Sequence, residues 1–300
     1  MLGVIGDVVQ DVVVWMQEEL RPATDTRSEI TMRRGGSAAN VAAFAGPRHP
    51  TRFIGRVGAD LGGHVVRQEL EGHGVDVRLQ VGESTGMIVV LIDDRGERSM
   101  FPSRGESARI EPVEQAWLDD LEILHLTGYS LAEEPSASNV LDAARRVHEG
   151  GGRVSFDVSS TGMIDLYGID RFVDLVVDLA PDVITANDDE ARMLGLVGDA
   201  AGPGPLARRL PETIVLARAG QDPTRVLRGG DLVATVPVTP AEVVRDMTGA
   251  GDAFNAGFLT ATLRGAGLEE AVVAAHSLAR RVLAHPGASE GEVDLPSPSA

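Results

Sequence analysis

Short apolar runs alternate along the chain with longer stretches in which apolar residues recur at helical spacing. The runs predict strands at 2–5, 53–57, 123–126, 154–156, 183–185 and 214–216. The stretches between them predict helices that include 38–45, 61–70, 137–149, 188–194, 250–264 and 268–284. Strands that are apolar throughout and alternate with helices indicate a mostly parallel central sheet flanked by helices on both faces, which is a three-layer α/β fold.

Two segments interrupt this alternation. The first pairs 12–15 with 29–32, and the second places 87–93 and 98–101 on either side of Asp94-Arg95-Gly96, a sequence that favours a hairpin turn. We expect these segments to form a small antiparallel sheet that projects from the main unit, the alternative being an extension of the main sheet at its edge. The expected division is a main α/β unit of residues 1–11, 34–84 and 102–300 and a small β-sheet of residues 12–33 and 85–101.

The composition excludes several classes of chemistry. The 300 residues include no cysteine, which excludes disulfides, thiolate metal sites and a cysteine nucleophile. All 27 basic residues are arginine. A chain without lysine has no Walker A loop, no Schiff-base lysine and no protein-kinase lysine. It also lacks a Gly-x-Gly-x-x-Gly segment after the first strand, which argues against a nicotinamide-dependent dehydrogenase.

The charge and the hydropathy limit the partners. The formal net charge is −18, which repels the phosphates of DNA and RNA, so we expect no nucleic-acid partner. No apolar run approaches the roughly 18 residues of a membrane span, so we expect no membrane partner. The first residues lack the basic region and the cleavage site of a leader peptide. These features predict a cytoplasmic protein.

The most specific segment is 246–254, which reads DMTGAGDAF and leads from a glycine-rich turn directly into an apolar helix. Small residues let the backbone approach a ligand, and the free N–H groups and dipole of a helix start favour an anion. Asp252 falls in the first helical turn, where an acidic residue is also common for structural reasons. An anion site and a carboxylate within one turn suit phosphoryl transfer, in which the carboxylate accepts the proton of an attacking hydroxyl.

Two further segments place polar residues at the start of predicted helices. The first, RGGSAAN at 34–40, has two glycines before a helix of small residues, a pattern that alone indicates only a turn. The second, NDDE at 187–190, follows the predicted strand 183–185. Asn187 is a good helix cap and acids suit the first turn. The functional alternative is a carboxylate that orders water around Mg²⁺.

Together these motifs resemble the PfkB/ribokinase family of carbohydrate kinases over almost the whole chain. Segment 246–252 is the most specific match, and segments 35–40 and 54–62 are similar to the family's N-terminal signature. The opening segment 6–11 resembles the family's first strand with its sugar-binding aspartate, and segment 85–98 resembles the lid hairpin. Asn187 and Glu190 match the family's Asn-x-x-Glu motif. The resemblance implies a ribokinase-like fold in which the small β-sheet is a lid.

The resemblance also implies an ATP-dependent kinase that transfers the γ-phosphate to a primary hydroxyl of a sugar or sugar acid. Asp252 would be the general base. The anion hole would be formed by the backbone of Gly249, Ala250 and Gly251. The residues that would hold sugar hydroxyls are Asp11, Gly36 and Asn40, since carboxylate and carboxamide groups bind hydroxyls well.

The same resemblance implies where MgATP binds. Asn187 and Glu190 would support Mg²⁺ and the ATP phosphates, Glu190 through water. The other nucleotide contacts would come from Arg218, Gly220 and His276. A monovalent cation, with activation by K⁺, would lie near Asp246, Thr248 and the backbone of 285–288, because oxygen ligands suit a hard cation.

Two departures from the family's pattern affect the substrate. The nucleotide loop usually reads Gly-x-x-Gly, but its last position here is Pro223, and proline neither adopts positive φ nor donates an N–H. We therefore expect a loop of different shape. Segment 35–38 also lacks the lysine of ribokinases, and segment 126–129 lacks their ribose-contacting glutamate, which argues against ribose itself.

Several alternatives stay open. A sugar-phosphate acceptor would need basic residues at the mouth of the pocket, for which the candidates are Arg33, Arg34, Arg98 and Arg104. A nucleoside acceptor would need an apolar platform, for which the candidates are Trp15, Phe101 and Tyr129. A non-catalytic sugar or nucleotide sensor is also compatible with the fold, although the intact Asp252 argues against it. An exposed lid has edges and an apolar face to cover, so a homodimer through the lid is a further hypothesis.

Overall fold

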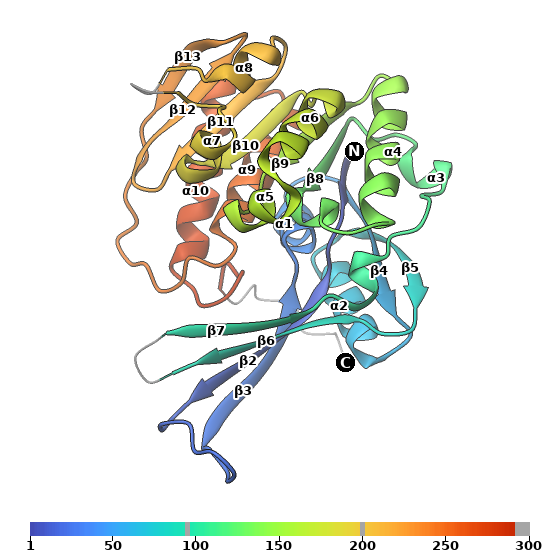
Figure 1. Ribbon diagram of the computed structural model, residues 1–300, viewed down its shortest axis with the longest axis vertical. Coiled ribbons are helices and arrows are strands. Elements are labelled where there is room, and N and C mark those ends of the chain that lie inside the picture. Colours follow the sequence, from blue (N-terminus) through green and yellow to red (C-terminus); the bar gives the residue numbers. More distant parts are fainter. Residues whose placement is uncertain (94–96, 199–201, 292–300) are drawn as a thin grey trace, which may run out of the picture.

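The computed structural model describes residues 1–93, 97–198 and 202–291, in which the chain forms a large and a small sheet (Figure 1). The large sheet has the strand order β13-β12-β11-β10-β9-β8-β1-β4-β5. Its parallel strands are β1 (Leu2–Ile5), β4 (Thr51–Gly58), β5 (Asp76–Gly82), β8 (Ile123–Thr127), β9 (Arg153–Asp157), β10 (Val183–Asn187) and β11 (Ile214–Ala219). Strands β12 (Asp222–Arg228) and β13 (Asp231–Val236) continue the sheet in antiparallel pairing. All six predicted strands are present.

Helices cover both faces of the large sheet, and each face has its own core. One face carries α1 (Ser37–Ala45), α2 (Leu61–Gly72), α9 (Ala250–Leu263) and α10 (Leu268–Leu283). The other carries α3 (Gln115–Leu118), α4 (Ser136–Glu149), α5 (Thr161–Tyr167), α6 (Ile169–Leu179), α7 (Asp188–Met193) and α8 (Pro205–Arg209). Neighbouring residues of one strand enter opposite cores, as Val4 and Ile5 do in β1. This two-sided burial explains the uninterrupted apolar runs and confirms the three-layer α/β architecture.

The small sheet projects from the main body and is separate from the large sheet (Figure 1). It consists of β2 (Val9–Met16), β3 (Ser28–Gly35), β6 (Gly86–Ile92) and β7 (Arg98–Ser103) in the order β3-β2-β6-β7. The predicted pairing of 12–15 with 29–32 is confirmed by β2 and β3. The turn predicted at 94–96 lies outside the described residues. The strands begin closer to the main body than the expected boundaries, since residues 9–11 and 34–35 already belong to β2 and β3.

The expectation that this small sheet is antiparallel throughout is wrong. Strands β2 and β6 form the central pair and run parallel. Both leave the main body in the outward direction, and each returns through its own antiparallel neighbour, β3 or β7. Local turn patterns predict each hairpin but not the pairing between the two hairpins, because that pairing joins segments far apart in the chain.

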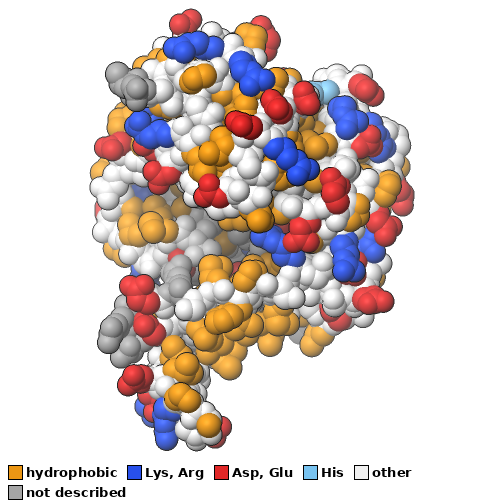
Figure 2. Space-filling view, viewed as in Figure 1, with side chains coloured by type: hydrophobic (Ala, Val, Ile, Leu, Met, Phe, Trp, Pro, Cys, Tyr) orange, Lys and Arg blue, Asp and Glu red, His pale blue; other side chains and the backbone are white. Residues whose placement is uncertain are grey.

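The topology brings the carboxyl ends of the parallel strands to one edge of the large sheet. The starts of α1, α7 and α9 lie at that edge, which is where ligands bind in open α/β sheets. The space-filling surface is hollowed between the main body and the small sheet (Figure 2). Among the described residues, no helix is long and apolar enough to cross a membrane.

Candidate active site

The start of α9 follows a glycine turn in which the Ala250 backbone N–H donates to the Met247 carbonyl oxygen at 3.3 Å. Gly249 precedes the helix with φ +78°, and a Cβ there would lie 2.5 Å from the Cβ of Ala288, so only glycine fits. In the described part of the chain, no side chain caps α9. An uncapped helix start, followed directly by Ala250 and Gly251, offers donors and a favourable dipole to an anion. The anion hole that the sequence places here stays a prediction.

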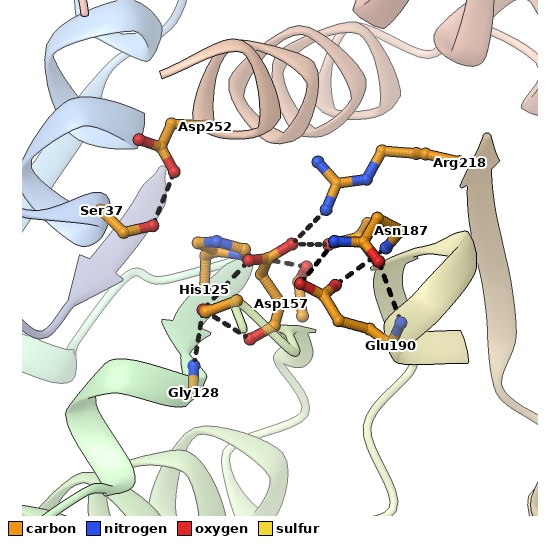
Figure 3. Close-up of polar contacts among 11 residues, drawn as sticks. Ser37, His125, Gly128, Asp157, Asn187, Glu190, Arg218 and Asp252 are labelled. Carbon is orange, nitrogen blue, oxygen red and sulfur yellow. Dashed lines mark hydrogen bonds and ion pairs between the residues drawn. The ribbon is translucent and has the colours of Figure 1, made fainter. Parts of the chain in front are cut away.

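Asp252 lies in the first turn of α9 and is held on both oxygens. Its Oδ1 accepts a hydrogen bond from Ser37 Oγ at 2.6 Å (Figure 3). Its Oδ2 accepts one from Asn40 Nδ2 at 2.8 Å. Burial raises the pKa of Asp252 to about 7, against the lowering effect of these two bonds. The negative charges of Asp157 and Asp7 raise it further. A carboxylate that titrates near neutral pH suits a general base.

Asn40 connects Asp252 to the base of the small sheet. Its Oδ1 accepts a hydrogen bond from the buried guanidinium of Arg34, at the end of β3. Arg34 also pairs with Glu69 of α2, with Nε and Oε1 3.2 Å apart. Both contacts fix the Arg34 side chain in place. Arg34 is therefore a structural partner of Asn40, and its guanidinium does not serve the mouth of the pocket.

Asp11 and Gly36 face the same region from β2 and the start of α1. The Oδ1 atom of Asp11 is buried and has no hydrogen-bond partner among the described residues. Burial raises the pKa of Asp11 to about 6, which the charge of Arg34 opposes and that of Asp7 reinforces. Gly36 has φ +95°, and a Cβ there would lie 2.5 Å from the carbonyl oxygen of Asp7. Gly36 thus contributes through its backbone, whereas Asp11 keeps one buried oxygen without a partner among the described residues.

Asp7 was not among the predicted site residues. Its Oδ2 accepts a hydrogen bond from the backbone N–H of Ser37 at 2.8 Å, and its Oδ1 accepts one from that of Ala38 at 3.2 Å. Asp7 therefore holds the start of α1, the helix that carries Asn40. The available signal was its place directly after the first buried strand, where polar residues reach the ligand edge.

Asn187 and Glu190 form a reciprocal cap at the start of α7. The Asn187 backbone N–H donates to Glu190 Oε2 at 2.8 Å, and the Glu190 backbone N–H donates to Asn187 Oδ1 at 2.9 Å. The structural interpretation of this motif is therefore confirmed. Burial raises the pKa of Glu190, and the charge of Asp157 adds to this effect. Since the described residues contain no cluster of three or more acidic or histidine side chains suited to a metal, Mg²⁺ would need phosphate oxygens as ligands.

Arg218 extends from the end of β11 to the start of α9. Its Nη2 donates to Asp157 Oδ1 at 3.0 Å, as Figure 3 shows. A Cβ at Gly251 would lie 2.6 Å from Arg218 Nη1, so the guanidinium lies directly against the predicted anion hole. Its plane also lies over the ring of Phe254, 5.5 Å from the centroid. Asp157 is a second site residue that the sequence analysis missed.

The predicted nucleotide loop is a tight turn. Gly220, with φ +63°, and Gln221 connect β11 to the antiparallel β12. Pro223 lies inside β12, beside a register irregularity, which gives the physical reason for the unusual loop. His276 of α10 is near this hairpin, with its Nε2 2.8 Å from Thr224 Oγ1, and packs on Phe254. Burial lowers the pKa of His276.

The predicted cation region is also assembled. Asp246 Oδ1 accepts from the Thr248 backbone N–H at 2.9 Å, and its Oδ2 accepts from the Gly287 backbone N–H at 2.8 Å. The two segments named by the sequence analysis, 246–248 and 285–288, therefore lie side by side. Arg33 of β3 joins them by donating to the carbonyl oxygen of Pro286 at 2.6 Å.

Of the remaining two candidate arginines, Arg104 has a described side chain, whereas only the backbone of Arg98 is described. Arg104 lies over the ring of Tyr129, 5.3 Å from the centroid. Burial raises the pKa of Tyr129, with further contributions from the charges of Asp7 and Asp252. Tyr129 therefore lies within electrostatic reach of the site, whereas Trp15 and Phe101 are exposed on the small sheet.

Known proteins match both the sequence and the fold. The model of the pfkB family carbohydrate kinases matches residues 1–294. A fructokinase of Klebsiella pneumoniae is 30% identical over 266 residues, which are 86% of this chain and 83% of that enzyme. An ATP-dependent ribose-1-phosphate kinase of Halopiger xanaduensis is 31% identical over 270 residues, which are 86% of this chain and 84% of that enzyme.

A solved structure, the adenosine kinase of Sinorhizobium meliloti, shares the fold with a TM-score of 0.80. It covers 96% of this chain and 94% of its own at 23% identity. The match of the family model over nearly the whole chain, the identity with named kinases and the shared fold agree. The chain belongs to the pfkB family of carbohydrate kinases and is a phosphotransferase.

Proposed function

We propose that this kinase transfers the γ-phosphate of MgATP to a primary hydroxyl of an unphosphorylated sugar or sugar acid, with Asp252 as the general base. One observation carries the proposal: a carboxylate of near-neutral pKa lies in the first turn of a helix that no side chain caps among the described residues. The acceptor oxygen attacks the γ-phosphorus, the bond to the β,γ-bridging oxygen breaks, and the hydroxyl proton passes to Asp252. The products are the phosphorylated acceptor and ADP.

The chain's own groups have distinct roles in this step. The backbone N–H groups at Gly249, Ala250 and Gly251 stabilise the negative charge on the transferring group. Ser37 and Asn40 orient the carboxylate of Asp252 toward the acceptor. The small sheet acts as a lid that excludes water and so limits ATP hydrolysis.

The acceptor lies between the small sheet and the start of α1. Asp11 accepts hydrogen bonds from sugar hydroxyls on its unpartnered Oδ1, and Asn40 and the backbone at Gly36 complete the binding surface. A carboxylate left buried without a partner is costly, so a ligand hydroxyl that satisfies it gains that free energy on binding.

The nucleotide lies along the ends of β10 to β12. Glu190 would hold Mg²⁺ through water, and the metal would neutralise the charge of the phosphates when bound. Arg218 supplies a fixed positive charge beside the anion hole. The turn at Gly220 and the His276 side chain would contact the adenosine.

A monovalent cation would bind between segments 246–248 and 285–288. The supporting feature is the pair of hydrogen bonds by which Asp246 joins Thr248 to Gly287. Carboxylate and carbonyl oxygens are the ligands that a hard cation prefers. We expect turnover to fall when K⁺ is replaced by tetramethylammonium at constant ionic strength. Equal turnover in the two salts would remove this site from the proposal.

Arg104 favours a sugar acid within the proposed class, and it would also favour a sugar phosphate as a second acceptor class. Its guanidinium stacks on Tyr129, and no ion pair engages it among the described residues. An anionic group on the acceptor, as in a sugar acid or a sugar phosphate, would find a partner there. Arg33 and Arg34 do not add to this surface, because Pro286, Asn40 and Glu69 already engage them.

The test is a coupled ADP-release assay with MgATP and a panel of sugars, sugar acids, sugar phosphates and nucleosides. We expect the highest kcat/KM with one unphosphorylated sugar or sugar acid. If a sugar acid loses this advantage in Arg104→Gln while neutral sugars are unaffected, the carboxylate of the acceptor binds beside Arg104. A preference for a sugar phosphate or a nucleoside would contradict the proposed acceptor class. Binding of MgATP without turnover of any acceptor would favour a sensor.

A further inference from the structure

Arg218 is placed by contacts from three directions. Its side chain is only 16% exposed, although it comes from a strand end next to the ligand edge. Nη1 lies against Gly251, the guanidinium plane lies over Phe254, and Nη2 donates to Asp157 Oδ1 at 3.0 Å. Of these contacts, only that with Asp157 is directional and charged. The position of the guanidinium therefore depends on the carboxylate.

Asp157 is itself rigidly held at the end of β9. It is 4% exposed, and its Oδ1 accepts a hydrogen bond from Thr185 Oγ1 of the neighbouring β10 at 2.7 Å. Its Oδ2 accepts one from Ser159 Oγ at 3.1 Å. Burial favours the neutral acid, but Arg218 and Thr185 outweigh it, so the pKa of Asp157 is lowered and the group is ionised. A buried, ionised and hydrogen-bonded carboxylate is a fixed anchor for a cation.

The neighbouring histidine does not compete for this charge. His125 of β8 is fully buried, and its Nδ1 is 3.0 Å from Ser155 Oγ. Burial lowers the pKa of His125 to about 4, with Asp157 opposing and Arg218 adding to this effect. The ring is therefore neutral in the physiological pH range. Arg218 is the cation that pairs with Asp157 among the described residues.

We propose that Asp157 is a positioning residue that holds the Arg218 guanidinium over the start of α9, where Arg218 stabilises the charge on the transferring phosphoryl group. This inference rests on the proposed function, and it assigns a role to a carboxylate outside the acceptor pocket. Arg218 Nη1 lies against Gly251, so this is the nitrogen that would donate to a phosphate oxygen at the helix start. Because Arg218 is fixed before the substrate binds, it needs little reorganisation during the reaction.

The test is a double-mutant cycle on Asp157→Asn and Arg218→Ala, with kcat, the KM for MgATP and the KM for the acceptor measured separately. Asp157→Asn keeps the shape and loses the charge. We expect it to lower kcat on the order of 10- to 100-fold with little change in acceptor KM. Arg218→Ala should cost more, on the order of 100- to 1,000-fold in kcat. The double variant should match Arg218→Ala alone, because the anchor has no effect once the anchored group is gone.

A control separates positioning from the general loss of an ion pair within the large sheet. Asp76 pairs with Arg52 at 2.7 Å, at the amino ends of β5 and β4 and so at the opposite edge of the sheet. Asp76→Asn should leave kcat unchanged. Added guanidinium should restore part of the kcat of Arg218→Ala, and it should fail to do so in the double variant, which lacks the carboxylate that holds it.

The same double-mutant cycle can be measured without turnover, by calorimetric titration with the non-hydrolysable analogue AMP-PNP and Mg²⁺. Non-additive loss of affinity supports the positioning role even if no acceptor is phosphorylated, in which case only the proposed function fails. Additive effects on both kcat and binding in an active enzyme would overturn the inference and leave the proposed function standing. So would a folded Asp157→Asn variant with the kcat of the original chain.

Discussion

The start of α9 and the base of the small sheet face the same site, but their carboxylates differ in how fully they are hydrogen-bonded. At α9, both oxygens of Asp252 have partners, Ser37 and Asn40. On the small sheet, Asp11 keeps a buried Oδ1 without a partner among the described residues. Under the proposed function, the group for proton transfer is set before binding, whereas the group for recognition is completed by the acceptor.

The two regions also differ in how they are covered. The large sheet has helices and an apolar core on each face. On the small sheet, register places Met32, Val12, Val89 and Phe101 in one row across the four strands. Met32 and Phe101 are 64% and 57% exposed, and apolar side chains gather over this part of the surface in Figure 2. Helices therefore cover the apolar faces of the large sheet, while the small sheet exposes an apolar face.

The largest expected effect is at α9. Asp252→Asn keeps the size of the side chain and removes the base, so kcat should fall by about 10²- to 10⁴-fold while the acceptor KM changes little. Steady-state kinetics with the best acceptor of the panel measure both. Near-normal turnover would show that another group accepts the proton. The start of α9 could then no longer be distinguished from the small sheet as the place of proton transfer.

The pH dependence comes next. Asp252 must be ionised to accept a proton, so kcat/KM should rise tenfold per pH unit at low pH and level off above its pKa of about 7. Because Asp11 titrates at about 6 and binds hydroxyls as the anion, the slope should steepen below that pH. In Asp11→Asn, the steeper slope of kcat/KM below pH 6 should disappear, while the rise that levels off near pH 7 should remain. A profile that is flat from pH 5 to pH 8 would contradict both assignments.

The small sheet should affect recognition rather than chemistry. Asp11→Asn replaces a charged acceptor of hydrogen bonds by a neutral one, which costs about 1.5–3 kcal/mol, or roughly 10- to 150-fold in acceptor KM. The kcat at saturating acceptor should change little. Glu29→Gln, at an exposed position of β3, is the matched control on the same sheet. A fall in kcat with unchanged acceptor KM would place Asp11 with the catalytic groups instead.

The smallest effect on turnover is expected at the exposed apolar row. We propose that a second copy of this chain covers it, because an uncovered row of this kind is unusual on a monomer. Sedimentation velocity at micromolar concentration should show a dimer, and Met32→Glu should shift it to monomer with little change in kcat. Leu232→Glu, an exposed apolar position on edge strand β13, should leave the dimer intact. A monomer at every concentration would refute the dimer.

The sequence predicted the parallel sheet well because its strands are buried on both faces, and it predicted less of the rest. Strands β5, β12 and β13 were missed. β5 is mostly half-buried and β13 mostly exposed, so neither is apolar throughout. In β12, charged residues and a proline leave only Val226-Leu227 as an apolar run. The parallel pairing of β2 with β6 depends on two separate hairpins meeting. Such pairing leaves no local signature in either segment.

The site shows the same limit. Segment 246–252 is continuous in sequence, so its glycines and Asp252 were recognised together, and the structure brings them close to Asn40. Asp157 is different, because the residue that it serves, Arg218, lies 61 positions further along the chain. A single aspartate after a strand carries no local pattern. Only the order of β9, β10 and β11 in the sheet brings the two side chains into contact.

The most direct test of the account is calorimetric titration of the acceptor into Asp252→Asn and into the original chain, both with AMP-PNP and Mg²⁺. If Asp252 moves a proton and the acceptor is held by groups on the small sheet and α1, the two proteins should bind the acceptor with nearly equal affinity, although only one turns it over with ATP. Loss of acceptor binding in Asp252→Asn would contradict the account, because Asp252 would then hold the acceptor rather than activate it.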